Sequence, residues 1–340
     1  MSRPSPTRPT LEQVARRAGV GRGTASRVIN GGDRVSTRAR EAVEAAIAEL
    51  GYVPNSAART LVTRRTDTVA LVIAESEERI FGEPFFAGVV RGIGAALSDA
   101  NLQMVLLLAQ SGHRTGSLDS FLIPQHVDGV LLLSLHDDDT LPESIRARDL
   151  PVVLGGQPGG REGFGFVDVD NDLGARLAVS HLVERGRTHI ATIAGPADMV
   201  AGRTRFAGYL AGLAEAGRTP DPRLQATGDF SQDSGEAAMH EILTRCPEVD
   251  GVFCANDLMA AGALRALRES GRAVPADVSL VGFDDAPLAL STEPPLSTVH
   301  QSPEEMGREM VDLMLQTMSR GDAPQPGRVL PTHLVVRGSS

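Results

Sequence analysis

Residues 10–30 read TLEQVARRAGVGRGTASRVIN, and this stretch predicts two short helices joined by a turn. Thr10 has the side chain of a good N-cap, and Gln13 three residues later completes a capping box. The first helix is expected to end at Gly19, because glycine adopts the left-handed C-terminal conformation at little cost. The second helix is expected over 22–29. Together they predict a helix-turn-helix, whose second helix enters the DNA major groove, and the alternative is an ordinary helical hairpin.

The outward face of the second predicted helix is polar and cationic. Side chains of this kind can contact phosphates and base edges. The candidates for DNA contact are Arg22, Thr24, Ser26, Arg27 and Asn30. Gly23 lies inside this helix and costs it up to about 1 kcal/mol relative to alanine. With no side chain there, Arg22 and Thr24 are the first candidates for reading bases.

The charge of the chain is divided unevenly. The 340 residues carry a net charge of −10, but residues 1–65 hold twelve arginines against five acidic residues, so that segment is +7 and the remainder −17. A basic segment on an acidic body is typical of a DNA-binding domain joined to a domain that does not touch DNA. The chain contains no lysine, which excludes a Walker A loop and a Schiff-base lysine.

Nothing in the sequence indicates export or membrane insertion. No run of about twenty apolar residues occurs. The first ten residues, MSRPSPTRPT, lack the apolar core of a signal peptide. Cys246 and Cys254 lie in or near apolar runs, as buried thiols do in a reduced cytoplasm. We therefore expect a cytoplasmic protein with no bound metal and no cofactor.

From residue 69 onward, short apolar runs alternate with amphipathic helical stretches. The runs lie at 69–73, 103–108, 128–133, 151–155, 164–169, 189–195, 251–255 and 279–283. Continuous apolar strands separated by helices predict a parallel, doubly wound sheet of the α/β class. This region is too long for one such sheet, so two lobes are predicted.

Five motifs follow one another within residues 11–61: L-x-x-V-A-x-x-A-G-V, S-R-V-x-N-G, R-V-S, L-G-Y-x-P-N and A-x-x-L. In these motifs the chain resembles the LacI/GalR family of sugar-responsive transcription regulators. The resemblance implies a helix-turn-helix headpiece over 1–53, a hinge helix and linker over 54–68, and a core resembling periplasmic binding proteins over 69–340. In the hinge, Leu61 takes the position of a residue that wedges into the DNA minor groove, with Asn55 and Ala58 as further DNA contacts. The alternative is a linker with an incidental leucine.

The resemblance also implies three crossings between the two lobes of the core. They are expected near Asp170, Ser297 and Arg328. Lobe 1 would then comprise 69–170 and 298–328, and lobe 2 would comprise 171–297 and 329–340.

A ligand is expected in the cleft between the lobes, at the carboxyl ends of the strands. By its position, Arg203 resembles the family's main ligand-binding arginine, whose planar fork can bind two vicinal hydroxyls. Phe230 resembles an aromatic platform, whereas Phe85 could instead be a core residue. The candidate ligand-binding residues are Phe85, Phe86, Asp170, Arg203, Phe230, Asn256, Asp284 and Gln301.

One segment departs from the family pattern. The stretch IAESEERIFGEPFF (73–86) is longer than the family's usual V-x-x-x-x-N-P-F-F, and its acidic part, Glu75 to Glu83, is expected to reshape the rim of the cleft. The ligand therefore cannot be copied from a well-known family member.

These observations favour a homodimeric repressor of carbohydrate genes, without enzymatic activity. We expect it to bind a palindromic operator in double-stranded DNA and to respond to a mono- or oligosaccharide. The alternatives are a periplasmic-type sugar-binding protein and a regulator that responds to a purine or nucleoside. A sugar-modifying enzyme is a further reading, but no catalytic constellation supports it.

Overall fold

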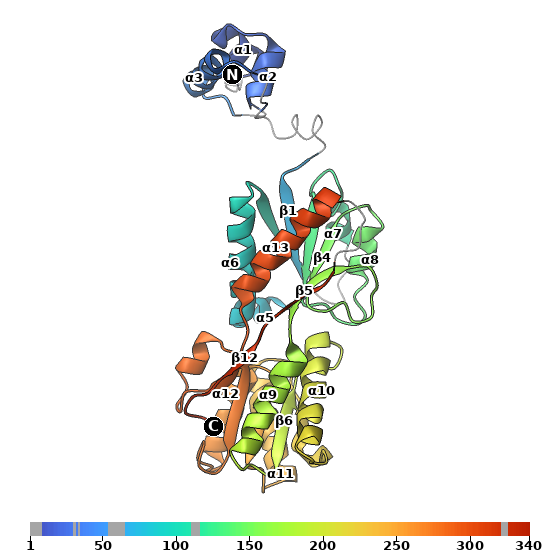
Figure 1. Cartoon of the computed structure of the whole chain (residues 1–340), viewed down its shortest axis with the longest axis vertical. Coiled ribbons are helices and arrows are strands. Elements are labelled where there is room, and N and C mark those ends of the chain that lie inside the picture. Colours follow the sequence, from blue (N-terminus) through green and yellow to red (C-terminus); the bar gives the residue numbers. More distant parts are fainter. Residues whose placement is uncertain (1–8, 30–31, 33–34, 54–64, 110–115, 321–325) are drawn as a thin grey trace, which may run out of the picture. The chain divides into compact units, whose positions relative to one another are not determined.

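The computed structural model describes residues 9–29, 32, 35–53, 65–109, 116–320 and 326–340 (Figure 1). The chain divides into two compact units, Met1–Thr66 and Asp67–Ser340. The candidate DNA contacts Asn30, Asn55, Ala58 and Leu61 lie outside the described residues.

The first unit is a bundle of three helices, α1 (Leu11–Ala18), α2 (Arg22–Ile29) and α3 (Thr37–Leu50). The predicted capping box is confirmed: the Thr10 hydroxyl accepts from the Gln13 backbone, and the Gln13 side chain accepts from the Thr10 backbone. Gly19 ends α1 in the left-handed conformation, with φ of 66°. The core of the bundle is made of small side chains from all three helices: Val14, Ala15, Ala25, Val28, Val43 and Ala46.

The second unit contains two six-stranded sheets. The first sheet runs in the order β11-β5-β4-β3-β1-β2, and its strands are β1 (Thr68–Ile73), β2 (Gln103–Leu108), β3 (Gly129–Leu133), β4 (Val152–Gly155), β5 (Gly165–Val169) and β11 (Arg328–Leu330). The second runs in the order β12-β10-β9-β8-β6-β7, and its strands are β6 (Ile190–Ala194), β7 (Gln225–Thr227), β8 (Gly251–Cys254), β9 (Ser279–Asp284), β10 (Ser297–His300) and β12 (His333–Val335). All eight predicted apolar runs are strands, which confirms the doubly wound α/β prediction.

Helices cover both faces of each sheet, so the strands are apolar on both sides. In β1, Val69, Leu71 and Ile73 pack on the face covered by α6 (Pro84–Asp99) and α13 (Pro303–Arg320), whereas Ala70 and Val72 pack on the face covered by α7 (Gly116–Phe121) and α8 (Leu141–Arg146) (Figure 1). The helices of lobe 1 are α5 (Glu77–Gly82), α6 (Pro84–Asp99), α7 (Gly116–Phe121), α8 (Leu141–Arg146) and α13 (Pro303–Arg320). Those of lobe 2 are α9 (Asn171–Glu184), α10 (Val200–Glu215), α11 (Gln232–Arg245) and α12 (Asp257–Glu269), with 3₁₀ turns at Pro222–Leu224 and Pro287–Leu290. In the described part of the chain, no helix has the length and apolar character needed to span a membrane.

The pairing of the strands shows that two of the three crossings between the lobes lie a few residues beyond the expected positions. The first lies at Asp170, between β5 and α9. The second follows His300 rather than Ser297, because β10 pairs with β9 and so belongs to lobe 2. The third follows Leu330 rather than Arg328, because β11 pairs with β5 of lobe 1. The final strand β12 is antiparallel to β10, an exception to the otherwise parallel sheets.

The two sheets share one topology. In each, the first strand of the lobe lies between the second and the third, so β1 is flanked by β2 and β3, and β6 by β7 and β8. The chain therefore changes direction at β1/β3 in lobe 1 and at β6/β8 in lobe 2. In open α/β sheets, ligands bind at the carboxyl ends of the strands beside such a switch point. Functional side chains are thus expected just after β1, β3, β6, β8 and β9.

Candidate functional site

Four of the residues predicted to contact DNA lie on α2, within the part of the chain that the structure describes. Arg22 and Arg27 are exposed, and Thr24 and Ser26 are half-buried, while Ala25 and Val28 face the core. The Arg22 Nε lies 3.0 Å from Glu12 Oε1 of α1. The Arg27 Nε donates to the carbonyl of Gly23 across one helical turn, at 3.2 Å. The helix therefore presents two guanidinium groups to solvent, as a helix that contacts DNA requires.

In the second unit a cavity of about 100 Å³ lies between the lobes. It is lined by Arg79, Glu83, Phe85, Phe86, Leu133, Ser134, Leu135, Gly155, Gly156, Gln157, Arg161, Asp168, Met199, Val200, Ala201, Arg205, Phe230, Asp284, Gln301 and Met306. We call it the inner cavity. It includes five of the predicted ligand residues: Phe85, Phe86, Phe230, Asp284 and Gln301.

Arg205 of α10 is the buried cation of the inner cavity, with 6% of its surface exposed. Its Nε donates to Asn171 Oδ1 at 2.7 Å, and its Nη1 donates to the carbonyl of Ala255 at 2.6 Å. The guanidinium also lies over the Phe283 ring, 3.6 Å from its centre. Burial lowers the pKa of Arg205, while the nearby carboxylates, Asp284 foremost, raise it. The guanidinium is thus fixed in one orientation before any ligand arrives, which reduces the entropy cost of binding.

Asp284 faces Arg205 from the end of β9. Its Oδ1 accepts from Gln301 Nε2 at 2.6 Å and lies 3.5 Å from Arg205 Nη1. Burial raises the pKa of Asp284 to about 6, against the lowering effect of Arg205. Gln301 belongs to the second crossing between the lobes, so this hydrogen bond connects that crossing directly to the floor of the inner cavity.

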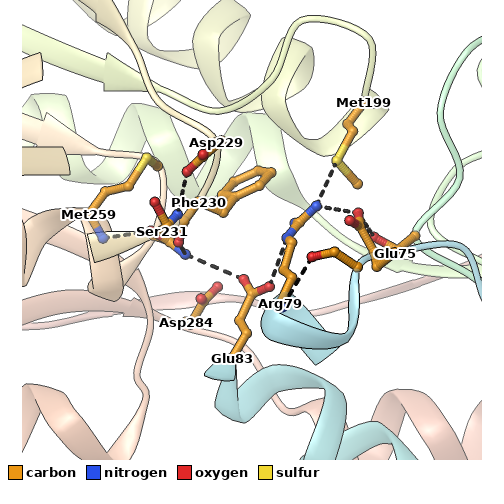
Figure 2. A network of polar contacts seen from close by, with 12 residues as sticks. Glu75, Arg79, Glu83, Met199, Asp229, Phe230, Ser231, Met259 and Asp284 are labelled. Atoms are coloured by element: carbon orange, nitrogen blue, oxygen red, sulfur yellow. Dashed lines mark hydrogen bonds and ion pairs between the residues drawn. The ribbon is translucent and has the colours of Figure 1, made fainter. Parts of the chain in front are cut away.

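The short helix α5 projects Arg79 into the cleft between two carboxylates of its own segment (Figure 2). The Arg79 Nη1 pairs with Glu75, and its Nε lies 3.2 Å from Glu83 Oε2. Burial raises the pKa of Glu83 to about 7, Arg79 opposes this, and Asp284 adds to it. For Glu75, burial favours a higher pKa, but hydrogen bonding to His136 and the charge of Arg79 bring the pKa below its ordinary value. The acidic segment expected at the rim therefore lies inside the cleft as well.

Phe230 follows β7 with φ of 71°, in the left-handed region, and only 4% of it is exposed. Its carbonyl accepts from Asn256 Nδ2 at 2.9 Å. The tip of its ring abuts Gly195, where an ideal Cβ would lie 2.4 Å from the ring. The Arg79 guanidinium lies over the ring, 4.8 Å from its centre. Phe230 is thus held at its backbone, its tip and one face.

A larger cavity of about 610 Å³ adjoins the inner one, and we call it the outer cavity. Arg79, Glu83 and Phe230 line both cavities. The remaining lining residues of the outer cavity are mostly polar or acidic: Glu75, Ser76, Glu78, Gly82, His136, Pro196, Asp229, Ser231, Gln232, Asp233 and Leu258. A third cavity, of about 340 Å³, shares Phe85, Asp284 and Gln301 with the inner one.

The rim of the cleft carries direct contacts between the lobes. His136 Nδ1 of lobe 1 lies 2.7 Å from Asp198 Oδ2 of lobe 2. Hydrogen bonding to Glu75 raises the pKa of His136 to about 9, against the effect of burial, and Asp198 adds to the increase. Beside it, Arg203 Nη1 of lobe 2 lies 2.6 Å from Asp137 Oδ2 of lobe 1.

Three predicted ligand residues do not line any of the three cavities described here. Arg203 is directed to the rim, paired with Asp137 and donating to the carbonyl of Ala197 at 2.7 Å. Asn256 caps α12 by accepting from the Met259 backbone at 2.9 Å, and so supports the site from behind. Asp170 caps α9 by accepting from Leu173. The structure places Arg205, two residues beyond Arg203, in the cavity position expected for an arginine.

Several polar residues that line the inner cavity were not predicted from the sequence. They are Arg79, Glu83, Gln157, Arg161, Asp168 and Arg205. A signal for Arg205 is present in the sequence, since it lies three residues from both Gly202 and Gly208 and so shares the glycine-rich face of α10. That face is buried, and Arg203 lies on a different side of the helix.

One group of possible metal ligands lies outside the cleft. Glu236 and His240 of α11 and Glu269 of α12 bring their ligand atoms within 4.8 Å of one another. Arg265 lies 3.4 Å from Glu236 and 3.2 Å from Glu269, so its charge already accounts for both carboxylates. We therefore assign no metal to this group.

The inner cavity combines a fixed guanidinium, a carboxylate and an amide with aromatic walls. These groups can donate hydrogen bonds to hydroxyl groups and accept hydrogen bonds from them, and the rings can pack against an apolar face. Arg79 and Arg205 are each already neutralised by carboxylates, so the cavity contains little uncompensated positive charge for an anionic ligand. A neutral polyhydroxyl compound fits this chemistry.

Residues 10–55 match the bacterial regulatory proteins of the lacI family, and residues 179–340 match a periplasmic binding protein-like domain. The HTH-type transcriptional regulator CelR of Thermobifida fusca is 56% identical over 335 residues, which cover 98% of each chain.

Solved structures of transcriptional regulators are also similar to this chain. A transcriptional regulator CelR–cellobiose complex aligns with a TM-score of 0.79 and 52% identity, covering 98% of this chain and 100% of that one. The lac repressor dimer bound to operator and an anti-inducer aligns with a TM-score of 0.85 and 30% identity, covering 98% and 99% of the two chains. The similarity therefore extends over both units of the chain.

Proposed function

The chain belongs to the LacI family of bacterial regulatory proteins, and on that premise we propose that it is a transcriptional repressor whose operator binding responds to a saccharide. The saccharide binds between the lobes of the second unit. Arg205, Asp284 and Gln301 bind its hydroxyl groups, and Phe230 provides an apolar surface.

One observation carries this proposal: the inner cavity joins both lobes, and the chain that contains it is similar along its whole length to a regulator solved with cellobiose. Cellobiose is a neutral disaccharide with many hydroxyl groups, which suits the compensated charges of Arg205 and Arg79. We propose a β-linked glucose disaccharide or a related oligosaccharide as the effector.

We propose that the protein acts as a homodimer on a palindromic operator in the cytoplasm, since twofold symmetry in the protein matches twofold symmetry in the site. In each half-site, α2 contacts the major groove through Arg22, Thr24, Ser26, Arg27 and Asn30. The hinge, with Asn55, Ala58 and Leu61, contacts the minor groove. The proposed regions are 1–53 for the headpiece, 54–68 for the hinge and 69–340 for the core.

A gel-shift titration tests the proposal. The purified protein is first used to select its binding site from random double-stranded DNA, and the selected site is then titrated with and without cellobiose. We expect a palindromic selected site and a changed affinity in the presence of the disaccharide, while glucose 6-phosphate has no effect. Light scattering on the protein–DNA complex should give two chains per site.

Two alternative functions would give different results in the site selection or in thermal unfolding with ligands. A binding protein without a DNA role would select no palindrome. A regulator that responds to a nucleoside would select one, but its thermal unfolding temperature would rise with adenosine or cytidine and not with cellobiose.

A further inference from the structure

The inner and outer cavities are adjacent parts of one cleft, separated by side chains that line both. Those side chains are Arg79, Glu83 and Phe230. Ligand sites commonly have volumes of about 300–1,000 Å³. The inner cavity, at about 100 Å³, lies below this range, and the outer cavity, at about 610 Å³, lies within it. A ligand that reached the inner groups Arg205 and Asp284 would need more room than the inner cavity offers.

Arg79 is the side chain that fills this room. It extends from α5 of lobe 1 toward Phe230 and Met199 of lobe 2 (Figure 2). Its guanidinium carbon lies 4.8 Å from the centre of the Phe230 ring, and its Nη1 lies 3.4 Å from Met199 Sδ. With the ring tip against Gly195, Phe230 is left 4% exposed. Stacking a sugar on Phe230 therefore requires the ring face under Arg79 to become free.

The contacts of Arg79 differ in strength between the two lobes. Within lobe 1 it is paired with two carboxylates, Glu75 and Glu83, one helical turn on either side. Toward lobe 2, its direct contacts among the described residues are with a sulfur atom and with an aromatic ring, both of which are weak individually, and its charge also lowers the pKa of Asp284. The guanidinium can thus leave Phe230 while keeping a carboxylate partner in its own segment. Glu75 already holds one end of this guanidinium and lines the outer cavity but not the inner one, so the side chain keeps a partner on the outer side when it leaves the ring.

We propose that Arg79 occupies the saccharide-stacking face of Phe230 in the unliganded protein, and that the effector displaces it. Displacement joins the inner and outer cavities into one binding site. This inference rests on the proposed saccharide effector, and it assigns to the acidic segment 75–83 a specific role in effector selection. A ligand too small to displace Arg79 gains neither the aromatic face nor the outer cavity, so Arg79 sets a minimum size for the effector.

Isothermal titration calorimetry with cellobiose tests the displacement. The variant Arg79→Ala removes the internal competitor, and we expect it to bind cellobiose roughly three- to thirtyfold more tightly than the wild type. The matched control is Arg265→Ala, because Arg265 also lies between two carboxylates but outside the cleft. We expect the control to bind with unchanged affinity.

The possible outcomes separate this inference from the proposed function. If the wild type binds cellobiose and a folded Arg79→Ala binds it equally or more weakly, the displacement is wrong and the saccharide effector stands. If neither protein binds cellobiose or longer cello-oligosaccharides, both are wrong. If Arg79→Ala unfolds at a much lower temperature than the control, the variant Arg79→Lys is titrated in its place. Lysine keeps a positive charge beside Glu75 and Glu83 but lacks the planar guanidinium. A tighter complex with Arg79→Lys supports the displacement, and an unchanged or weaker one contradicts it.

Discussion

His136 and Asp198 join the two lobes through a 2.7 Å contact between Nδ1 and Oδ2 at the rim of the cleft. They lie on opposite lobes, so a separation of the two lobes at this rim would break the contact. The other ring nitrogen of His136 lies 3.2 Å from Glu75, next to Arg79. The lobe contact and the outer cavity therefore share one carboxylate, that of Glu75.

The first prediction concerns pH. The pKa of His136 is raised from 6.5 to about 9 in the folded protein. Its stabilising effect is therefore complete at pH 6.5 and below, and is lost as the pH rises through 9. Glu75 is the main cause of this increase, and because Asp198 is largely exposed to solvent, its own share of the effect is limited to about 1 kcal/mol or less. We expect the thermal unfolding temperature of the wild type to exceed that of His136→Gln below pH 7 and to approach it above pH 9.

Differential scanning calorimetry of the two proteins from pH 6 to 10 measures this difference. Groups that titrate in both proteins cancel in the comparison, so a buried acid such as Glu83 does not affect it. A difference that stays constant over the whole range would show that the His136 contact carries no charge.

The second prediction separates the two arginines of α10. Arg205→Lys should weaken cellobiose binding by about a hundredfold, because lysine cannot reproduce the planar hydrogen bonds of the guanidinium. Arg203→Ala should leave binding nearly unchanged, because the Arg203 side chain is paired with Asp137 at the rim. Calorimetric titration measures both affinities, and operator binding without ligand serves as the folding control. A large loss with Arg203→Ala and none with Arg205→Lys would return the ligand contact to Arg203.

The third prediction concerns Gly195, which lies directly after β6. An alanine Cβ there would lie 2.4 Å from Phe230 Cζ, so Gly195→Ala must displace the ring. Overpacking of this kind costs about 1–3 kcal/mol, and it should lower both the unfolding temperature and the affinity for cellobiose. Gly94→Ala is the control, because its Cβ would meet nothing within 4 Å on the surface of α6. Equal unfolding temperatures for the two variants would mean that Phe230 moves freely.

Local signals made the headpiece and the main strands predictable from the sequence. The capping box at Thr10 and Gln13 and the stop at Gly19 are decided by neighbours within a few residues, and the structure contains both. The eight apolar runs were long enough to be recognised as strands. The strands that were missed, β7, β10, β11 and β12, have only three or four residues each, and Ser297–His300 is largely polar. Whether such a short segment becomes a strand is decided by its pairing with the neighbouring strand, and the local sequence does not show that pairing.

The cleft was harder to predict because its residues meet across the two lobes. Phe230 and Asp284 follow strands and could be placed from that fact. Arg79 could not, since its segment is longer than the family pattern and only the fold shows that it reaches Phe230 and Met199. The choice between Arg203 and Arg205 depended on which side of α10 is buried, and a motif alignment does not show that.

The last prediction concerns base recognition by α2. Arg22 is exposed, and its ion-pair partner among the described residues, Glu12, is exposed as well, so its guanidinium can exchange that partner for a base edge. Arg22→Ala should cost about 1–3 kcal/mol on the selected operator and relax the sequence preference at one position per half-site. Arg17→Ala removes the same charge from the headpiece, but Arg17 binds Glu49 of α3 and should cost less and relax no position. Repeating the site selection with each variant measures both effects. Equal losses on operator and random DNA for Arg22→Ala would show that Arg22 contacts only phosphate, and base reading would then fall to Thr24 and its neighbours on α2.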